Sequence, residues 1–180
     1  MGGCDFLTEA AFLVDASNTF NVINRQAALH NIHILGPAIS TILSNTYQTP
    51  ITLYIPGEGE ILSGEGTTQG DPLEMAMYMY ALAVRPLVDK LREAEPTTRQ
   101  VWFADDATAA GKLHSLYQWW QNILTIGPKL GYFPNAHKTL LVVKPSLVDE
   151  ANRLFKDSNV KISTISQRLL GAALGSQEFA

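Results

Sequence analysis

Two adjacent acidic residues, Asp105 and Asp106, stand inside the apolar stretch "VWFADDATAAG" that covers residues 101–111. Burying a carboxylate without a partner is costly in free energy, so acids in such surroundings need a cation or an exposed turn. Asp is itself common in turns. The stretch therefore predicts two strands, within residues 100–110, that fold about the two aspartates.

The length and composition fit one globular domain. The chain has 180 residues, of which 46% are hydrophobic and 17% charged, as in folded proteins rather than disordered ones. A single cysteine, Cys4, excludes an intramolecular disulfide and fits a reducing compartment. No apolar stretch reaches the roughly 18 residues that predict a membrane span. Phe6 stands where N-myristoylation requires Ser or Thr, so we expect neither a lipid anchor nor a membrane partner.

Charge alone decides little about function. The net charge of −4 argues weakly against a nucleic-acid partner. Residues 1–95 hold 4 basic and 11 acidic side chains, whereas residues 96–180 hold 9 and 6. This asymmetry fits a metal-dependent enzyme that acts on phosphates, and it fits an ordinary acidic protein equally well.

The order of apolar runs and helical patterns predicts an α+β fold. Residues 11–16, "AFLVDA", are typical of a buried strand that ends in an acid, Asp15. Further strands are expected at 51–55, 61–64, 140–143 and 160–170, and helices at 24–33, 37–47, 73–84, 112–126 and 146–157. The sum is a small, largely antiparallel sheet backed by helices.

Asp15 gives the acidic pair a distant partner. If the strand that ends at Asp15 lies beside the strands around Asp105 and Asp106, three carboxylates meet at one sheet edge. Mg²⁺ prefers such hard oxygen ligands, and two ions together stabilise the attacking and leaving oxygens of a phosphoryl transfer. The alternative for the pair is a plain hairpin turn.

A second segment, "SGEGTTQGDPL" at residues 63–73, places spaced glycines before a strong helix start at Asp71-Pro72. Backbone N–H groups in such a loop suit the close approach of a phosphate or a base pair. The alternative is an ordinary turn before a capped helix.

Four segments taken together resemble, in order, the palm motifs of reverse transcriptases of the non-long-terminal-repeat retrotransposon and group II intron type. They are "FLVDASNTFN" (12–21), "TTQGDPL" (67–73), "FADDA" (103–107) and "LGYFPNAHKT" (130–139), and "QRLLGAALG" (167–175) resembles the start of the primer grip. The resemblance implies that residues 1–180 form a polymerase palm with a ferredoxin-like core, with fingers and thumb apparently missing. Ala104 before the acidic pair favours a reverse transcriptase over viral RNA polymerases, which usually have Gly there.

The resemblance also implies a role for each matching residue. Asp15, Asp105 and Asp106 match the catalytic aspartates that bind two Mg²⁺ ions, for which Mn²⁺ substitutes. Lys138 matches a lysine that protonates the leaving pyrophosphate, and the neighbouring His137 is a rival because its pKa lies nearer neutrality.

Nucleotide-binding roles follow in the same way. Phe20 matches the aromatic steric gate that selects deoxynucleotides, and Asn18 lines the same turn. Gln69 and Gly70 match the motif that packs on the template and the incoming base pair. Phe20 is equally well explained by packing in a core.

The expected activity is RNA-directed DNA polymerisation, the transfer of a dNMP to a primer 3′-hydroxyl, with RNA template, DNA primer and dNTP as partners. Fingers and thumb, or partner domains, would complete the enzyme, which would act in the cytoplasm or nucleus. The alternative is a truncated, non-catalytic remnant that serves as a structural or interaction module. A magnesium phosphatase or nuclease would leave "TTQGDPL" and Phe20 unexplained.

Three further points concern residues outside the motifs. His30 and His33 are interpreted as surface or packing residues rather than zinc ligands. For Glu74 the solvent side of a helix is one option, and we draw no conclusion from it. Because Trp119 and Trp120 are adjacent, we expect only one of them to face the core.

Overall fold

The computed structural model describes residues 8–17, 20–21, 24–57, 59–67, 70–74, 84–103, 105–165, 167–169 and 172–174. The predicted site residues Asn18 and Gln69 lie outside these ranges, as does most of the helix expected at 73–84. The contacts divide the chain into two compact units. The first consists of residues 1–16, 89–125 and 134–180, and the second of residues 17–88 and 126–133.

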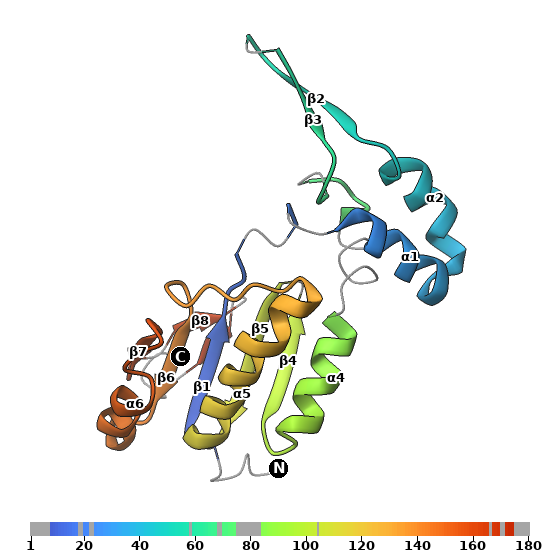
Figure 1. Cartoon of the computed structure of the whole chain (residues 1–180). Helices are drawn as coiled ribbons and strands as arrows, with labels where there is room; N and C mark the ends of the chain where they lie inside the picture. Colours follow the sequence, from blue (N-terminus) through green and yellow to red (C-terminus); the bar gives the residue numbers. More distant parts are fainter. Residues whose placement is uncertain are drawn as a thin grey trace. The chain divides into compact units, whose positions relative to one another are not determined.

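The first unit is built on a five-stranded sheet with the strand order β4-β5-β1-β6-β7 (Figure 1). The strands are β1 (Ala10–Val14), β4 (Arg99–Phe103), β5 (Asp106–Gly111), β6 (Leu140–Val143) and β7 (Lys161–Ser163). All neighbouring strands are antiparallel except β6 and β7, which are parallel. The predicted α+β class, with a largely antiparallel sheet, is thereby confirmed.

Helices complete this unit. α5 (Leu113–Ile126) belongs to it up to Thr125 and α4 (Val84–Ala94) from Asp89 onward, while η2 (Pro145–Leu147) and α6 (Val148–Leu154) connect β6 to β7. A separate hairpin pairs β8 (Gln167–Leu169) with β9 (Ala172–Leu174). The predicted helix at 146–157 is thus shorter than expected, because its first turn is 3₁₀ and the chain leaves the helix at Phe155.

The core of the first unit forms where α5 covers one face of the sheet. Along β1 the side chains alternate, and Phe12 is fully buried on the covered face. Its ring stacks on Trp120 at a centroid distance of 5.3 Å and lies 6.1 Å from Trp119. Both tryptophans are fully buried, so the expectation that only one faces the core is wrong. Consecutive helical residues point about 100° apart, and the core spans both directions.

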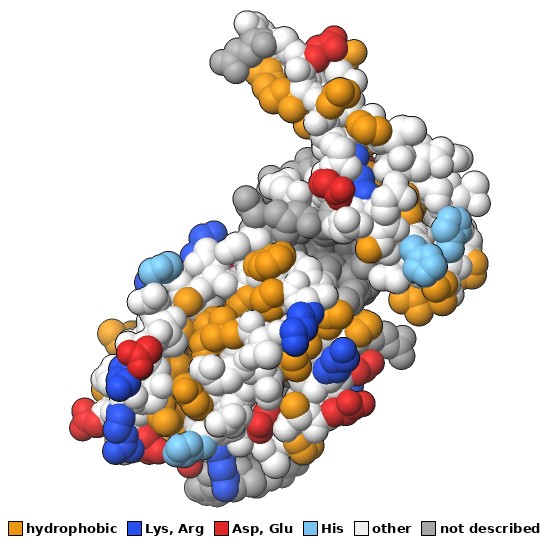
Figure 2. Space-filling view, in the orientation of Figure 1, with side chains coloured by type: hydrophobic (Ala, Val, Ile, Leu, Met, Phe, Trp, Pro, Cys, Tyr) orange, Lys and Arg blue, Asp and Glu red, His pale blue; other side chains and the backbone are white. Residues whose placement is uncertain are grey.

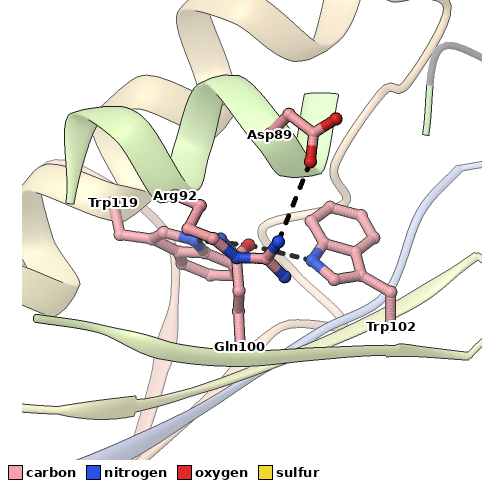
Figure 3. A network of polar contacts seen from close by, with 5 residues as sticks. All are labelled: Asp89, Arg92, Gln100, Trp102 and Trp119. Carbon is pink, nitrogen blue, oxygen red and sulfur yellow. Dashed lines mark hydrogen bonds and ion pairs between the residues drawn. The ribbon is translucent and has the colours of Figure 1, made fainter. Parts of the chain in front are cut away.

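The indole N–H groups of Trp102 and Trp119 share one acceptor, whereas Trp120 Nε1 is buried without a hydrogen-bond partner among the described residues. Gln100, on β4, accepts hydrogen bonds at its Oε1 from Trp102 Nε1 at 2.9 Å and from Trp119 Nε1 at 3.2 Å (Figure 3). An unpaired indole N–H would carry a desolvation cost. A single amide therefore lets β4 and α5 pack two tryptophans with their polar atoms satisfied.

The second unit contains two helices, α1 (Arg25–Leu35) and α2 (Pro37–Tyr47), joined at Gly36. Asn24 caps α1 by accepting the Ala27 N–H at 2.8 Å. The helices share a core to which Phe20 and Leu73 add partly buried side chains. The buried residues of this core are Ala28, Leu29, Ile32, Leu43 and Tyr47. His30 and His33 are exposed, as expected.

A hairpin of β2 (Ile51–Ile55) and β3 (Gly59–Ser63) follows α2, as predicted. Within the described part of the chain, these two strands pair only with each other. Large apolar side chains remain exposed along the hairpin, among them Tyr54 and Leu62. Figure 2 shows hydrophobic side chains at several places on the surface of this hairpin. The unit is completed by η1 (Gly127–Leu130). None of the described helices is long and apolar enough to cross a membrane.

Arg25 is a buried cation that organises the second unit. Its side chain is only 2% exposed. Nε donates to the Gly66 carbonyl at 2.5 Å, Nη1 to the Ser63 carbonyl at 2.6 Å and Nη2 to Ser63 Oγ at 2.9 Å. The guanidinium also lies 5.4 Å from the ring centroid of Tyr47. These contacts hold the loop after β3 against the start of α1.

Burial lowers the pKa of the Arg25 guanidinium, while Tyr47 and Glu65 oppose that shift. We predict that Arg25→Gln lowers the free energy of unfolding of this unit by about 3–5 kcal/mol, because buried acceptors lose a charged partner. Chemical denaturation followed by circular dichroism measures the change. The control is Arg92→Gln, which removes an arginine 63% exposed and paired with Asp89 at 3.8 Å and should cost below about 1 kcal/mol. Equal losses in the two variants would contradict the anchoring role.

Candidate active site

The register of the central strands places Asp15 opposite Asp106. β1 and β5 are antiparallel, with Val14 paired to Ala107. The next step of this register sets Asp15, which directly follows β1, across from Asp106, the first residue of β5. Phe12 and Val14 face α5, so the alternation of a strand directs Leu13 and Asp15 to the other face of the sheet. As predicted, Asp15 thus lies opposite one member of the acidic pair, Asp106.

Asp105 occupies the turn beside this pair. Phe103 pairs with Asp106, so only residues 104 and 105 connect β4 to β5. Asp105 is half-buried. The prediction that two strands fold about the aspartates is confirmed, with the refinement that Asp106 is already a strand residue and Asp105 belongs to the turn.

Lys138 approaches Asp15 from a turn that the backbone fixes in place. The Asn135 N–H donates to the Asp15 carbonyl at 2.8 Å, and the Asn135 carbonyl accepts from the Lys138 N–H at 3.1 Å and from Thr139 Oγ1 at 2.7 Å. The turn leads directly into β6. It brings Lys138 Nζ to 3.8 Å from Asp15 Oδ2, with the two side chains 64% and 39% exposed.

These side chains surround a small hollow of about 100 Å³. Its described lining consists of Leu13, Val14, Asp15, Asp106, Ala107, Thr108 and Lys138. His137, the rival of Lys138, is exposed and is not among these lining residues. The hollow therefore joins two carboxylates and one lysine at one end of β1 and β5.

The electrostatics of the hollow are set by crowded acids. Burial raises the pKa of the Asp106 carboxyl, and the nearby carboxylates of Asp105 and Asp15 raise it further. Each of these causes disfavours the charged form, and a cation between the acids would relieve both the crowding and part of the desolvation. Lys138 supplies one positive charge on the Asp15 side.

The donor set fits Mg²⁺. Carboxylate oxygens are the ligands that Mg²⁺ prefers, and in phosphate enzymes one or two protein carboxylates are enough, because water and substrate phosphates complete the coordination. Asp15 and Asp106 can provide those two, with Asp105 next to them in the chain. Among the residues described, no group of three His, Cys, Asp or Glu side chains lies close enough to hold a metal by itself.

Two predicted nucleotide-binding residues belong to the second unit. Phe20 is half-buried and packs against the core of α1 and α2, and its carbonyl accepts the Thr67 N–H at 2.7 Å. Gly70 has a positive φ of 89°, which suits glycine, and its N–H donates to Glu74 Oε2 at 2.8 Å. The contact of Phe20 with Thr67 joins the first two motifs of the resemblance within this unit.

Gly66 explains part of this contact. Its φ is +70°, and a Cβ atom there would lie 2.5 Å from the Asn21 carbonyl oxygen. Only glycine allows the loop at 64–67 to approach the backbone at 20–21 so closely. Of the two glycines of "SGEG", Gly66 therefore serves close backbone packing within the second unit, whereas a Cβ on Gly64 would meet nothing within 4 Å.

Sequence reasoning missed several residues that shape these sites. Glu74, from which the sequence supported no conclusion, is only 9% exposed and accepts the Gly70 N–H. Asp71 Oδ1 accepts the Leu73 N–H at 2.8 Å, and most of the helix that Asp71 is predicted to cap lies outside the described residues. Arg25 gave no signal, because an isolated polar residue in a sequence does not reveal which distant backbone groups it bonds.

Comparisons with known proteins add no assignment: no protein-family model matches the chain, and no curated protein matches it.

We predict that Asp106→Asn changes how stability depends on pH. The raised pKa means that the folded chain binds more protons than the unfolded one between the ordinary carboxyl pKa, about 3.9, and the folded value. Stability contributed by this group is therefore present below that window and falls as pH rises through it. At pH 7 Asp106→Asn should be more stable than the wild type, by less than about 1 kcal/mol because solvent screens a half-exposed group.

Thermal or urea unfolding between pH 3 and pH 8 measures this difference. Asp157→Asn is the control, because Asp157 is 87% exposed. The pH profile of Asp157→Asn should follow that of the wild type. An Asp106→Asn chain that is less stable than the wild type at pH 7 would contradict the predicted repulsion.

Proposed function

We propose that this chain is the palm of an RNA-directed DNA polymerase, which transfers a dNMP to the 3′-hydroxyl of a primer. The observation that carries the proposal is the hollow that Asp15 and Asp106 line from adjacent strands, with Asp105 in the turn and Lys138 Nζ 3.8 Å from Asp15. This grouping joins three of the four segments on which the resemblance rests. The motif order and the shared hollow support the proposal independently.

The roles of the residues follow from their chemistry. Asp15, Asp105 and Asp106 would hold two Mg²⁺ ions, or Mn²⁺ in their place. Bound there, the ions would supply Lewis-acid activation of the primer hydroxyl and charge neutralisation on the triphosphate. Lys138 is charged at pH 7 and long enough to reach a phosphate oxygen, so it would give its proton to the leaving pyrophosphate.

Lys138 is favoured over His137 for this step because Lys138 lines the hollow and contacts Asp15. Phe20 would exclude the ribose 2′-hydroxyl, and Asn18, Gln69 and Gly70 would contact the nucleotide and its base pair. RNA template, DNA primer and dNTP are the partners, and such an enzyme would act in the cytoplasm or nucleus.

A non-catalytic remnant that acts as an interaction module is the second candidate. The exposed apolar side chains of the β2–β3 hairpin favour it, since exposed apolar patches commonly mark contact surfaces. The two candidates differ in one measurable respect, namely whether the acidic residues support nucleotide incorporation.

Primer extension on an RNA template with dNTPs and Mg²⁺ or Mn²⁺ tests the proposal. We expect incorporation by the wild-type chain and a loss of about 10² or more in rate for Asp15→Asn and Asp105→Asn, since an amide cannot replace an anionic ligand. Asp157→Asn is the control and should extend the primer at the wild-type rate. Circular dichroism verifies folding. A folded wild-type chain that incorporates nothing would support the remnant instead.

A second experiment assigns the proton donor. We predict that Lys138→Gln lowers the single-turnover rate by about 10²-fold. Lys138→Arg should restore little, because a guanidinium stays protonated. His137→Gln is the matched control, and its rate should equal that of the wild type across the pH range. A loss confined to His137→Gln would assign the proton to histidine.

A further inference from the structure

A second hollow lies at the end of β5 opposite to Asp106. It measures about 400 Å³ and is lined by the end of β5, the start of β4 and the first turn of α5. Its polar lining comprises Thr8, Thr97, Arg99, Lys112 and Ser115. β5 runs from Asp106 to Gly111, so at about 3.4 Å per residue the two hollows lie roughly 17 Å apart. The second hollow is therefore separate from the acidic one.

Main-chain bonds hold the walls of this hollow in place. Arg99 pairs with Ala110 in the sheet, and the Glu9 N–H donates to the Gly111 carbonyl at 3.0 Å. On the opposite wall, Thr97 Oγ1 lies 3.3 Å from Ser115 Oγ, which ties the turn before β4 to α5. Arg99 and Ser115 are thus presented by a strand and a helix, and Thr97 and Lys112 by residues next to these elements.

The charges that face this hollow are positive. Arg99 and Lys112 both line it, and within the described chain neither forms an ion pair. The neighbouring acid, Glu9, is already engaged, because its Oε2 accepts the Leu113 N–H at 2.9 Å. Two cations and three hydroxyl groups around one hollow are the donors that a phosphate group accepts from.

The start of α5 adds a smaller contribution. Ser115 lies in the first turn of α5, a helix of 14 residues, where the helix dipole favours negative charge. Glu9 already uses part of this terminus by accepting the Leu113 N–H, so the side chains of Arg99 and Lys112 carry most of the attraction for an anion.

We propose that this hollow is a binding site for a phosphate group, held by Arg99 and Lys112 and by the hydroxyls of Thr97 and Ser115. The phosphate belongs to a free phosphate compound or to the end of a nucleic acid, and the same donors serve both. The site does not depend on polymerase activity, because none of its residues is assigned to the acidic hollow.

Isothermal titration with inorganic phosphate, at constant ionic strength set by chloride, tests the site. We expect saturable binding by the whole chain and a loss of about tenfold in affinity for Arg99→Gln and for Lys112→Gln, as each removes one charge-assisted contact. Lys156→Gln is the matched control. Lys156 follows α6 in the sequence, is 70% exposed and does not line the hollow. Its affinity should equal that of the wild type.

Two oligonucleotides of one sequence, with a 5′-phosphate or a 5′-hydroxyl, separate the sources of the phosphate. Tighter binding of the 5′-phosphorylated strand, lost in Arg99→Gln and Lys112→Gln, would assign the site to nucleic-acid ends. Binding of inorganic phosphate with no difference between the strands would assign it to free phosphate compounds. The proposal is overturned if inorganic phosphate does not bind, or if the control variant loses as much affinity as the other two while circular dichroism shows all of them folded.

Discussion

The antiparallel pairing of β1 with β5 is the constraint on which the first unit depends. The register that sets Val14 against Ala107 also decides which side chains share a face. Phe12 then meets the tryptophans of α5, while Asp15 and Asp106 emerge together on the other face. Because the side-chain period of a strand is two, a slip of one residue would exchange these faces and bury the acids. The packing of the hydrophobic core therefore keeps Asp15 opposite Asp106.

The ends of β5 have opposite electrical character. At its start, the carboxylates of Asp106 and Asp15 crowd one small hollow, and their repulsion is part of the reason for the raised pKa of Asp106. At its end, Arg99 and Lys112 face a larger hollow, and among the described residues neither forms an ion pair. One strand thus separates a place suited to cations from a place suited to anions. The short, apolar middle of β5 keeps the two charge sets from neutralising each other.

The second unit is organised by one buried cation. Arg25 bonds the Ser63 and Gly66 carbonyls, and this contact determines where the chain enters the segment that begins at Thr67. The positive φ of Gly66 then lets that segment approach the backbone at residues 20–21, where the Phe20 carbonyl accepts the Thr67 N–H. Two of the motifs that resemble reverse transcriptases are therefore brought into contact by residues outside both motifs.

The sequence by itself determined the local elements: the hairpin at Asp105, the strand that ends next to Asp15, the β2–β3 hairpin and the helix that Asn24 precedes. Each follows from short-range patterns of apolar, turn and capping residues, which act between neighbours in the chain. Only the tertiary structure decided that both Trp119 and Trp120 are buried, that Glu74 is buried against Gly70, and that Asn135 positions Lys138 beside Asp15. Those outcomes depend on which distant backbone and side-chain groups meet, and a linear sequence carries no local signal for such pairings.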